Sequence, residues 1–167
     1  MDLSDIQKPF LKWVGGKSQI LDKILEHFPS KMDSYHEIFL GGGSVLLALL
    51  SLQKRGSFQI EGDIYAYDLN PYLINVYHQI QTQPKKFYKF LSEYWNTYGN
   101  LSGTIINRQP QTLEEAKSSK ESYYYWIRNY FNQMDKLTPE GAAVFVFLNK
   151  TCFRGLYREG PKGFNAP

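Results

Sequence analysis

The sequence predicts an α/β fold, in which a parallel-type sheet carries helices, followed by a mainly helical insertion that ends in a β-hairpin. A short apolar run over 36–40 precedes a glycine turn and a helical pattern, so strand, turn and helix follow one another. A second apolar run over 64–69 precedes another helix, and this alternation is typical of a parallel sheet. From 84 to about 148 the apolar spacing is helical. We expect the sheet to be incomplete in this chain.

The first two predicted helices each follow glycines. Apolar residues at helical spacing predict a helix over 18–28, with Ser18 as its cap and Pro29 after its end. A leucine-rich run predicts the second helix over 44–53. The first strand therefore lies between these two helices.

A third helix is predicted to begin after Asn70, which suits a cap, and to extend to about residue 80. Pro71 suits the first turn of this helix. Further helices are predicted over 84–98, 121–134 and 139–148, with a polar linker over 99–111. The expected parts are an α/β part (1–83), a helical insertion (84–148) and a terminal hairpin (149–167).

The composition is rich in aromatic residues and mildly basic. Phe, Trp and Tyr make up 16% of the 167 residues, and the formal net charge is +3. Aromatic rings either build a core or offer stacking faces to bases. In the tyrosine-rich run over 123–130, packing is favoured over a phosphate contact by Arg128. The charge suits a polyanionic partner but does not identify one.

Several classes of protein are disfavoured by the sequence. A single cysteine, Cys152, excludes an internal disulfide and a cysteine-ligated metal cluster, and we interpret it as a buried thiol. No signal peptide is recognised at the amino terminus, and no apolar run approaches the roughly 20 residues that span a bilayer. We therefore expect a soluble, cytoplasmic protein without a metal site.

The run Phe39–Ser44, which reads F-L-G-G-G-S, has the placement of a nucleoside-binding turn. Glycines after a strand let the backbone approach a ligand, and the next helix presents N–H groups to it. The fingerprint G-x-G-x-x-G fails because Leu46 stands at its third glycine, which disfavours NAD and FAD. Asp68, at the end of the second strand, suits the ribose hydroxyls of S-adenosylmethionine. A simple tight turn is the alternative interpretation.

An earlier glycine pair lies in the run Phe10–Leu21, F-L-K-W-V-G-G-K-S-Q-I-L. Its end resembles a phosphate-binding loop, but Leu11 stands where that loop begins with glycine, so nucleoside triphosphate binding is disfavoured. Lys17 can instead hold a carboxylate, such as the methionine end of the cofactor. Trp13 can cover an apolar or sulfonium-bearing portion with its ring, or serve as a buried anchor.

Basic and aromatic residues alternate in the last block, Asn149–Pro167, which reads N-K-T-C-F-R-G-L-Y-R-E-G-P-K-G-F-N-A-P. Its glycines and proline predict a hairpin. Such an element fits the DNA major groove, where arginine reads guanine and an apolar tip touches the thymine methyl group. A surface hairpin with solvated charges is the alternative.

In their order, these three blocks resemble the Dam-type (D12 class) DNA adenine-N6 methyltransferases. The resemblance implies a Rossmann-like fold and methyl transfer from S-adenosylmethionine to the amino group of an adenine flipped out of double-stranded DNA. It implies site-specific DNA methylation, with a GATC-like site as one expectation and restriction–modification as one biological role. It implies neither a metal nor a covalent intermediate.

The resemblance implies cofactor binding by the α/β part (1–83), target recognition by the helical insertion (84–148) and DNA reading by the hairpin (149–167). It also predicts which residues act. The cofactor contacts are expected at Trp13, Lys17, Phe39, Gly41, Gly43 and Asp68, and the DNA contacts at Lys12, Phe153, Arg154, Leu156, Arg158 and Lys162. Leu156 and Arg158 match thymine and guanine contacts, and Lys12 matches a further guanine contact. The family often has asparagine at the position of Arg154, so the recognised sequence stays open.

The catalytic tetrapeptide of the family, D-P-P-Y, occurs nowhere in these residues, and neither do N-P-P-Y and S-P-P-Y. No catalytic residue is therefore predicted. Asn70-Pro71-Tyr72 lacks the second proline and is better explained as a helix cap. Three interpretations stay open: a fragment of a complete enzyme, a half completed by a second chain, or a module that binds cofactor and DNA without catalysis. An RNA-binding methyltransferase-like protein is a further alternative.

Overall fold

The computed structural model describes residue 3 and residues 5–167, and the chain divides into two compact units between Leu69 and Asn70. We had expected the first boundary after residue 83. Helix α3 (Pro71–Thr82) packs against α7 (Pro139–Thr151), which explains why it belongs to the second unit. The roles expected for the three parts remain predictions.

The first unit contains short parallel strand pairs. Strand β2 (Tyr35–Glu37) pairs with β4 (Ile64–Ala66), and β1 (Lys31–Met32) pairs with β3 (Gln59–Ile60). Helix α2 (Ser44–Lys54) follows β2 and precedes β3, so it connects one strand pair to the other. The predicted order of strand, glycine turn, helix and parallel strand is therefore confirmed, although the strands are shorter than the apolar runs and β1 and β3 were not predicted.

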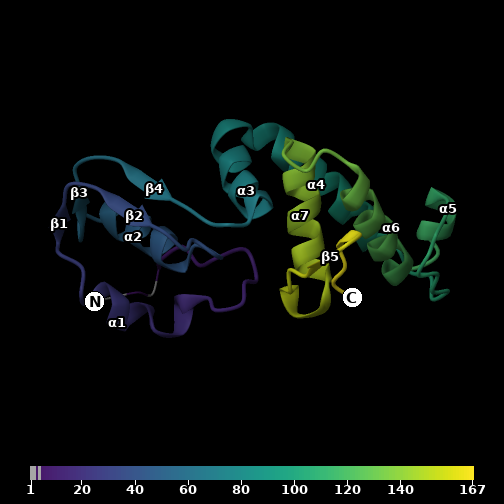
Figure 1. Ribbon diagram of the computed structural model, residues 1–167, viewed down its shortest axis with the longest axis horizontal. Coiled ribbons are helices and arrows are strands. Elements are labelled where there is room, and N and C mark those ends of the chain that lie inside the picture. Colours follow the sequence, from purple (N-terminus) through teal and green to yellow (C-terminus); the bar gives the residue numbers. More distant parts are fainter. Residues whose placement is uncertain (1–2, 4) are drawn as a thin grey trace. The chain divides into compact units, whose positions relative to one another are not determined.

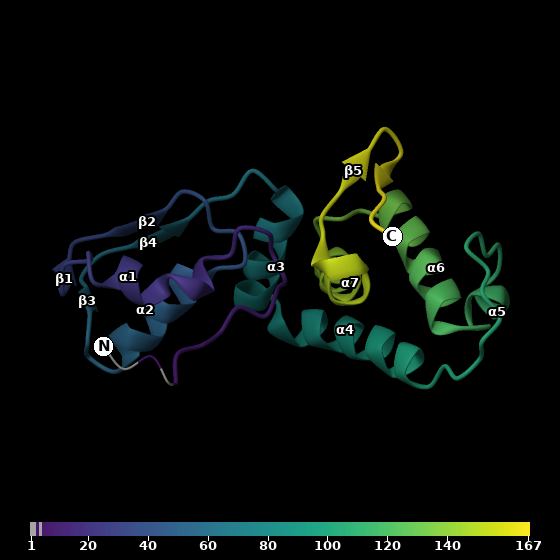
Figure 2. The same cartoon turned by 90° about the horizontal axis from the view of Figure 1, so that it is seen from below.

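Helix α2 packs its apolar side into the first unit, alongside β2 and β4 (Figures 1 and 2). Its buried apolar residues are Val45, Leu46, Ala48, Leu49 and Leu52. This helix begins and ends within a residue of the prediction. It is bonded to the end of the glycine turn, because the backbone N–H of Leu47 donates a hydrogen bond of 2.9 Å to the carbonyl of Gly43.

The helix expected over 18–28 is much shorter. A 3₁₀ turn, η1 (Lys17–Gln19), precedes α1 (Leu21–Leu25), whose two leucines are buried. Ser18 does not cap the helix, because its Oγ lies 3.2 Å from Oγ of Ser44. The prediction was therefore wrong in both the extent of this helix and its cap.

Helix α3 begins as predicted. The side-chain oxygen of Asn70 accepts hydrogen bonds from the backbone N–H groups of Tyr72, at 3.0 Å, and Leu73, at 3.1 Å. Pro71 occupies the first turn, where the missing N–H has no helical partner to lose. Asn70 is thus a helix cap, which accounts for the N-P-Y sequence without a catalytic role.

The second unit is mainly helical. Besides α3 and α7 it contains α4 (Pro84–Gly99), α5 (Leu113–Ala116) and α6 (Lys120–Gln133). Helix α7 is buried from 141 to 149 and packs against α3, α4 and α6 (Figure 2). The three helices predicted after residue 83 are confirmed to within a few residues, whereas α5 was not predicted. Within the described part of the chain, no helix is long and apolar enough to cross a membrane.

The terminal hairpin is smaller than expected. Helix α7 continues through Thr151, and the bond from N–H of Cys152 to the carbonyl of Leu148, at 2.8 Å, extends its helical pattern. A 3₁₀ turn, η2 (Phe153–Gly155), follows. Strands β5 (Glu159–Gly160) and β6 (Gly163–Phe164) then pair antiparallel. The hairpin therefore occupies 159–164 rather than the whole of 149–167.

Candidate functional site

The glycine turn after β2 lies beside the end of β4. The backbone N–H of Gly41 donates a hydrogen bond of 2.9 Å to Oδ2 of Asp68. Backbone bonds from Leu40 to Tyr67 and from Tyr67 to Glu37, each 2.8 Å, continue the parallel pairing up to this point. Residues 27 positions apart in the sequence are thereby brought together.

The ring of Trp13 lies against the same turn. A Cβ atom placed on Gly41 would lie 3.0 Å from Cδ1 of Trp13, and one on Gly42 would lie 3.4 Å from Cβ of Trp13. Gly41 and Gly43 have φ values of +51° and +75°, which side chains disfavour. The turn therefore requires glycine at position 41 for its backbone conformation and for the approach of the ring.

Lys17 and Glu37 line a cavity of about 10 Å³ together with Trp13. The Glu37 carboxylate is buried and accepts a hydrogen bond of 3.1 Å from the hydroxyl of Tyr35. Burial raises the pKa of this carboxyl above its usual range. The hydrogen bonds from Tyr35 and from the backbone of Leu46, and then the charge of Lys17, act in the opposite direction.

Glu37 was not predicted as a site residue. One acid inside a short strand produces no recognisable pattern, because strand periodicity reports only which face a residue lies on. Only the folded chain brings Glu37 and Lys17 to the same cavity. Phe39, which was predicted to contact the cofactor, is 72% exposed. Its role remains a prediction.

Arg158 directly precedes the hairpin and is bonded to Asn165, which directly follows it. Its Nε donates to Oδ1 of Asn165 at 2.7 Å, and one terminal nitrogen donates to the carbonyl of Asn165 at 2.8 Å. The backbone N–H of Asn165 in turn donates to the carbonyl of Arg158 at 2.9 Å. The guanidinium is thus exposed and has a fixed direction.

The residues before the hairpin form an exposed corner. Phe153 is 55% exposed, and the guanidinium of Arg154 lies 5.1 Å from the centre of its ring. Arg154 has φ of +55°, a conformation that costs an L-residue about 1–2 kcal/mol. Leu156 is half-buried beside Phe145, whereas Lys162 is exposed in the two-residue hairpin loop.

The hairpin is fastened to α6 by a residue that the sequence analysis missed. The side chain of Asn132 donates to the carbonyl of Phe164 at 2.9 Å and accepts from its N–H at 2.8 Å. A Cβ atom on Gly163 would lie 2.5 Å from Oδ1 of Asn132. Asn132 thus imitates a neighbouring strand, and glycine at position 163 makes room for it.

The tyrosine-rich run of α6 mainly packs the second unit, as expected. Tyr123 and Tyr124 are buried, and the hydroxyl of Tyr124 donates to the carbonyl of Ala166 at 2.7 Å. Tyr125 is half-buried and lies against arginine side chains. Cys152 is also buried, in agreement with its expected role.

The predicted DNA contacts are divided between the two units. Lys12 is exposed in the first unit, and the residues of η2 and the hairpin belong to the second. Over residue 3 and residues 5–167, no group of three or more His, Cys, Asp or Glu side chains is arranged to hold a metal ion. Among the described residues, the first unit therefore offers a glycine turn, a bonded carboxylate and a lysine, and the second offers the hairpin with the exposed cations beside it.

A sequence profile of the D12 class N6 adenine-specific DNA methyltransferases matches residues 13–167. The chain belongs to this class. Among relatives of this D12 chain, the type II methyltransferase M.MjaIII of Methanocaldococcus jannaschii is 34% identical over 168 residues, with 96% of the chain and 51% of the relative covered.

Two bacterial proteins named DNA adenine methylase are also similar to the D12 chain. The protein of Haemophilus influenzae is 31% identical, with 96% of the chain and 46% of the relative covered. The protein of Vibrio cholerae is 32% identical, with 96% and 47% covered. The chain thus spans about half the length of the curated relatives that it matches. The resemblance inferred from the three sequence blocks is confirmed at the level of the family.

Proposed function

We propose that this chain supplies the cofactor-binding and DNA-recognition elements of a DNA adenine-N6 methyltransferase. The proposed substrate is an adenine in double-stranded DNA, and the proposed cofactor is S-adenosylmethionine. Membership of the D12 class supports the reaction. The hydrogen bond between Gly41 and Asp68 is the observation that carries the proposal, because it joins the glycine turn to the acid that was predicted to bind the ribose.

The residues of the first unit fit a nucleoside cofactor. A carboxylate can accept several hydrogen bonds, so Asp68 can hold Gly41 and also accept from a ribose hydroxyl. Lys17 would hold the carboxylate of the methionine portion, and the Trp13 ring would cover the sulfonium. Bound S-adenosylmethionine would supply the methyl group that the adenine amine receives.

The cavity beside Trp13 is too small to enclose such a cofactor. Its volume of about 10 Å³ is far below the roughly 300–1,000 Å³ of small-molecule sites. The cofactor would therefore lie along the rim of the cavity, against the glycine turn, with Phe39 and Gly43 beside the adenosyl group. Binding on this rim would change the surroundings of the Trp13 ring.

The segment from Phe153 through the hairpin is the proposed reader of the DNA bases. Arg158 would exchange its bonds with Asn165 for a bidentate contact with guanine, and Leu156 would touch a thymine methyl group. Lys162 and Lys12 would add contacts to the DNA. Because adenine must leave the duplex to be methylated, an exposed side chain at Phe153 or Arg154 would fill the gap.

The proposal is tested by giving the chain methyl-labelled S-adenosylmethionine and double-stranded DNA, and by measuring N6-methyladenine in the digested product. Cofactor binding and DNA binding are measured in parallel. Methylation supports the full proposal. Binding of both ligands without methylation would leave a recognition module without catalysis. Binding of neither would refute the proposed function.

A further inference from the structure

A buried carboxylate lies beside the predicted cofactor residues of the first unit and has no role in the proposed function. Glu37, on β2, is 8% exposed and lines the cavity beside Trp13 together with Lys17. Of the residues that the structure describes around this cavity, Lys17 is the only cation and Glu37 the only anion. Burying a carboxylate costs free energy unless hydrogen bonds or an opposite charge compensate. We therefore ask which groups compensate Glu37 and what its charge does in return.

Glu37 has a fixed position between β2 and the start of α2. The hydroxyl of Tyr35 donates a hydrogen bond of 3.1 Å to its carboxylate, and the backbone N–H of Leu46 donates another. Leu46 belongs to the first turn of α2, whose preceding residue, Gly43, has no side chain that could cap the helix. A negative charge is stabilised at this end of a helix. The carboxylate thus caps α2 from the neighbouring strand.

The backbone of Lys17 is fixed, whereas its side chain has a flexible stem. The N–H of Gly16 donates to the carbonyl of Trp13 at 3.2 Å, and the N–H of Ile20 donates to the carbonyl of Lys17 at 3.1 Å. The rotamers of a lysine must be ordered when its ammonium binds an anion. Lys17 is half-buried and Glu37 is buried. The positive charge is therefore more accessible to an anion from solvent than the negative charge.

The two charges of the cavity act on each other. The ammonium of Lys17 lowers the pKa of Glu37, although burial, which raises this pKa, has the larger effect. Since the attraction between two charges is mutual, ionised Glu37 also draws the ammonium toward the cavity. This attraction favours rotamers of Lys17 that lie beside Gly41 and Trp13. A group that is already ordered loses less conformational entropy when a ligand binds.

We propose that Glu37 is a positioning residue, which holds the ammonium of Lys17 where the carboxylate of S-adenosylmethionine binds. This inference rests on the proposed cofactor-binding function. Glu37 acts through Lys17 and does not contact the cofactor. Its burial keeps its own charge away from the carboxylate of the cofactor.

The first test compares a ligand that has the carboxylate with one that lacks it. Calorimetric titration measures binding of S-adenosylmethionine and of methylthioadenosine, which has no amino acid portion. We expect Glu37→Gln to bind S-adenosylmethionine about three- to tenfold more weakly than the unmodified chain. Its affinity for methylthioadenosine should be unchanged. Equal affinity of both chains for S-adenosylmethionine, or an equal loss for both ligands, would overturn the proposal.

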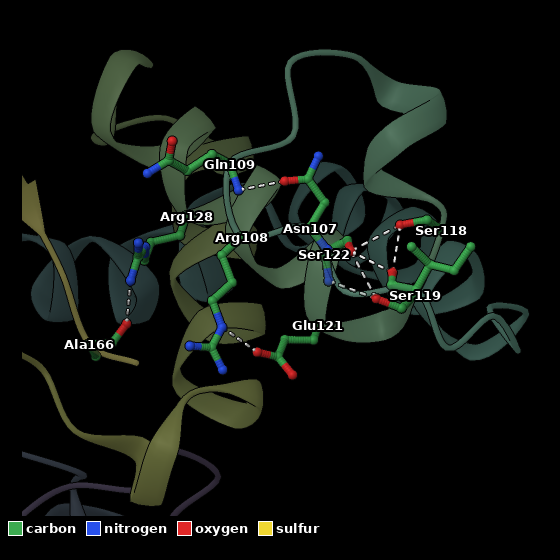
Figure 3. A network of polar contacts seen from close by, with 10 residues as sticks. Asn107, Arg108, Gln109, Ser118, Ser119, Glu121, Ser122, Arg128 and Ala166 are labelled. Atoms are coloured by element: carbon green, nitrogen blue, oxygen red, sulfur yellow. Dashed lines mark hydrogen bonds and ion pairs between the residues drawn. The ribbon is translucent and has the colours of Figure 1, made fainter.

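The matched control is Glu121→Gln in the second unit. It likewise removes a carboxylate that is paired with a basic side chain, because Glu121 accepts a hydrogen bond of 2.9 Å from Nε of Arg108 (Figure 3). This variant should bind both ligands as the unmodified chain does. A loss for S-adenosylmethionine as large as that of Glu37→Gln would show that any lost carboxylate has this effect, and would overturn the proposal.

A third ligand separates positioning from direct contact with the cofactor. Decarboxylated S-adenosylmethionine keeps the sulfonium and the ammonium but has no carboxylate. We expect Glu37→Gln to bind this ligand as well as the unmodified chain does. A loss equal to that for S-adenosylmethionine would overturn the proposal, because Glu37 would then bind the ammonium of the cofactor itself.

A double substitution tests whether Glu37 acts through Lys17. Lys17→Gln should weaken binding of S-adenosylmethionine by removing the cation that holds its carboxylate. When Lys17 is already replaced, Glu37→Gln should cause no further loss, as expected for two residues that act as one unit. A further loss as large as in the unmodified chain would overturn the proposal, since Glu37 would then act independently of Lys17.

The pH dependence of binding is a readout that a purely structural role would not change. Because its pKa is raised, Glu37 loses its charge at a higher pH than an ordinary carboxyl when the solution is acidified. The other titratable groups that act on Glu37 are Tyr35 and Lys17, and tyrosine and lysine keep their protons at acidic pH. The advantage of the unmodified chain over Glu37→Gln for S-adenosylmethionine should therefore disappear as the pH falls. An advantage that stays constant with pH would overturn the proposal.

Thermal unfolding shows whether Glu37→Gln folds, and glutamine can still accept the bonds from Tyr35 and Leu46. Tyr35→Phe provides a second variant, which keeps the charge of Glu37 but removes one bond that holds it. We expect a smaller loss, again for S-adenosylmethionine alone. If the unmodified chain binds neither S-adenosylmethionine nor methylthioadenosine, the proposed function itself fails. If it binds both and Glu37→Gln binds both equally well, only the positioning proposal fails.

Discussion

The carboxylate of Asp68 accepts a hydrogen bond of 2.9 Å from the backbone N–H of Gly41. The bond connects the end of β4 with the turn after β2, where parallel strands place ligands at their carboxyl ends. It also directs the side chain of Asp68 toward the turn that Trp13 covers. The positions of Asp68, Gly41 and Trp13 therefore depend on one another.

Replacing Asp68 should separate its hydrogen bond with Gly41 from its proposed contact with the ribose. Asp68→Asn keeps an oxygen that can accept from Gly41, whereas Asp68→Ala removes it. Hydrogen bonds to charged groups contribute about 1.5–3 kcal/mol, so the alanine variant should bind S-adenosylmethionine about 10- to 100-fold more weakly. The asparagine variant should lose less affinity for S-adenosylmethionine than the alanine variant. Calorimetric titration measures both, and equal affinity of all three chains would remove Asp68 from the site.

Gly41→Ala should destabilise the glycine turn more than a positive φ alone explains. The new Cβ would meet Trp13 at 3.0 Å. Gly56→Ala is the matched control, because Gly56 has φ of +76° and no atom within 4 Å of the added Cβ. The control should cost about 1–2 kcal/mol, the usual strain of this conformation. Urea unfolding of both variants gives the difference, and identical losses would show that the Trp13 contact has no energetic weight.

The local signals in the sequence were sufficient for most helices. Asn70 and Pro71 predicted the start of α3, since caps and first-turn prolines act through neighbouring backbone groups. The same reasoning failed at Ser18, whose hydroxyl contacts Ser44. That partner lies 26 positions away, so it could not be recognised from local spacing.

The candidate site was predictable only where glycines and an acid follow strands. Gly41 and Asp68 have this placement, and their contact follows from parallel pairing. The hydrogen bonds between Asn132 and Phe164 join residues 32 positions apart, and a single asparagine in a helix does not predict them. The gathering of arginines at Tyr125 likewise depends on tertiary structure.

Glu37 should make stability depend on pH in the acidic range. Burial raises its pKa above the usual 4.5, so the unfolded chain releases this proton at a lower pH than the native chain. The free energy of unfolding should therefore fall as pH rises from about 4.5 to the raised pKa of Glu37, and this contribution should then level off. Glu37→Gln lacks this proton.

Urea unfolding at several pH values measures this effect as the difference in free energy between Glu37→Gln and the unmodified chain. The advantage of the variant should grow with pH through the same range, because glutamine can accept the bond from Tyr35 without carrying a charge. A difference that stays constant with pH would mean that Glu37 keeps an ordinary pKa in the native chain.

Asn132→Ala should loosen the hairpin without unfolding the helices. It removes two hydrogen bonds to the backbone of Phe164 and leaves those groups partly buried, at a cost of about 2 kcal/mol. We expect faster amide hydrogen exchange in 159–165 and weaker DNA binding. Asn96→Ala, at an exposed position of α4, is the control. Unchanged exchange in the hairpin would show that Asn132 does not hold it.

The central claim is that the glycine turn, Trp13 and Lys17 form the surface that binds S-adenosylmethionine. Ultraviolet crosslinking of labelled cofactor to the chain, followed by identification of the labelled peptide, tests it most directly. We predict saturable label on Trp13 or on 39–43, with a large reduction in Asp68→Ala. Saturable label confined to 70–167, or no saturable label at all, would contradict the claim.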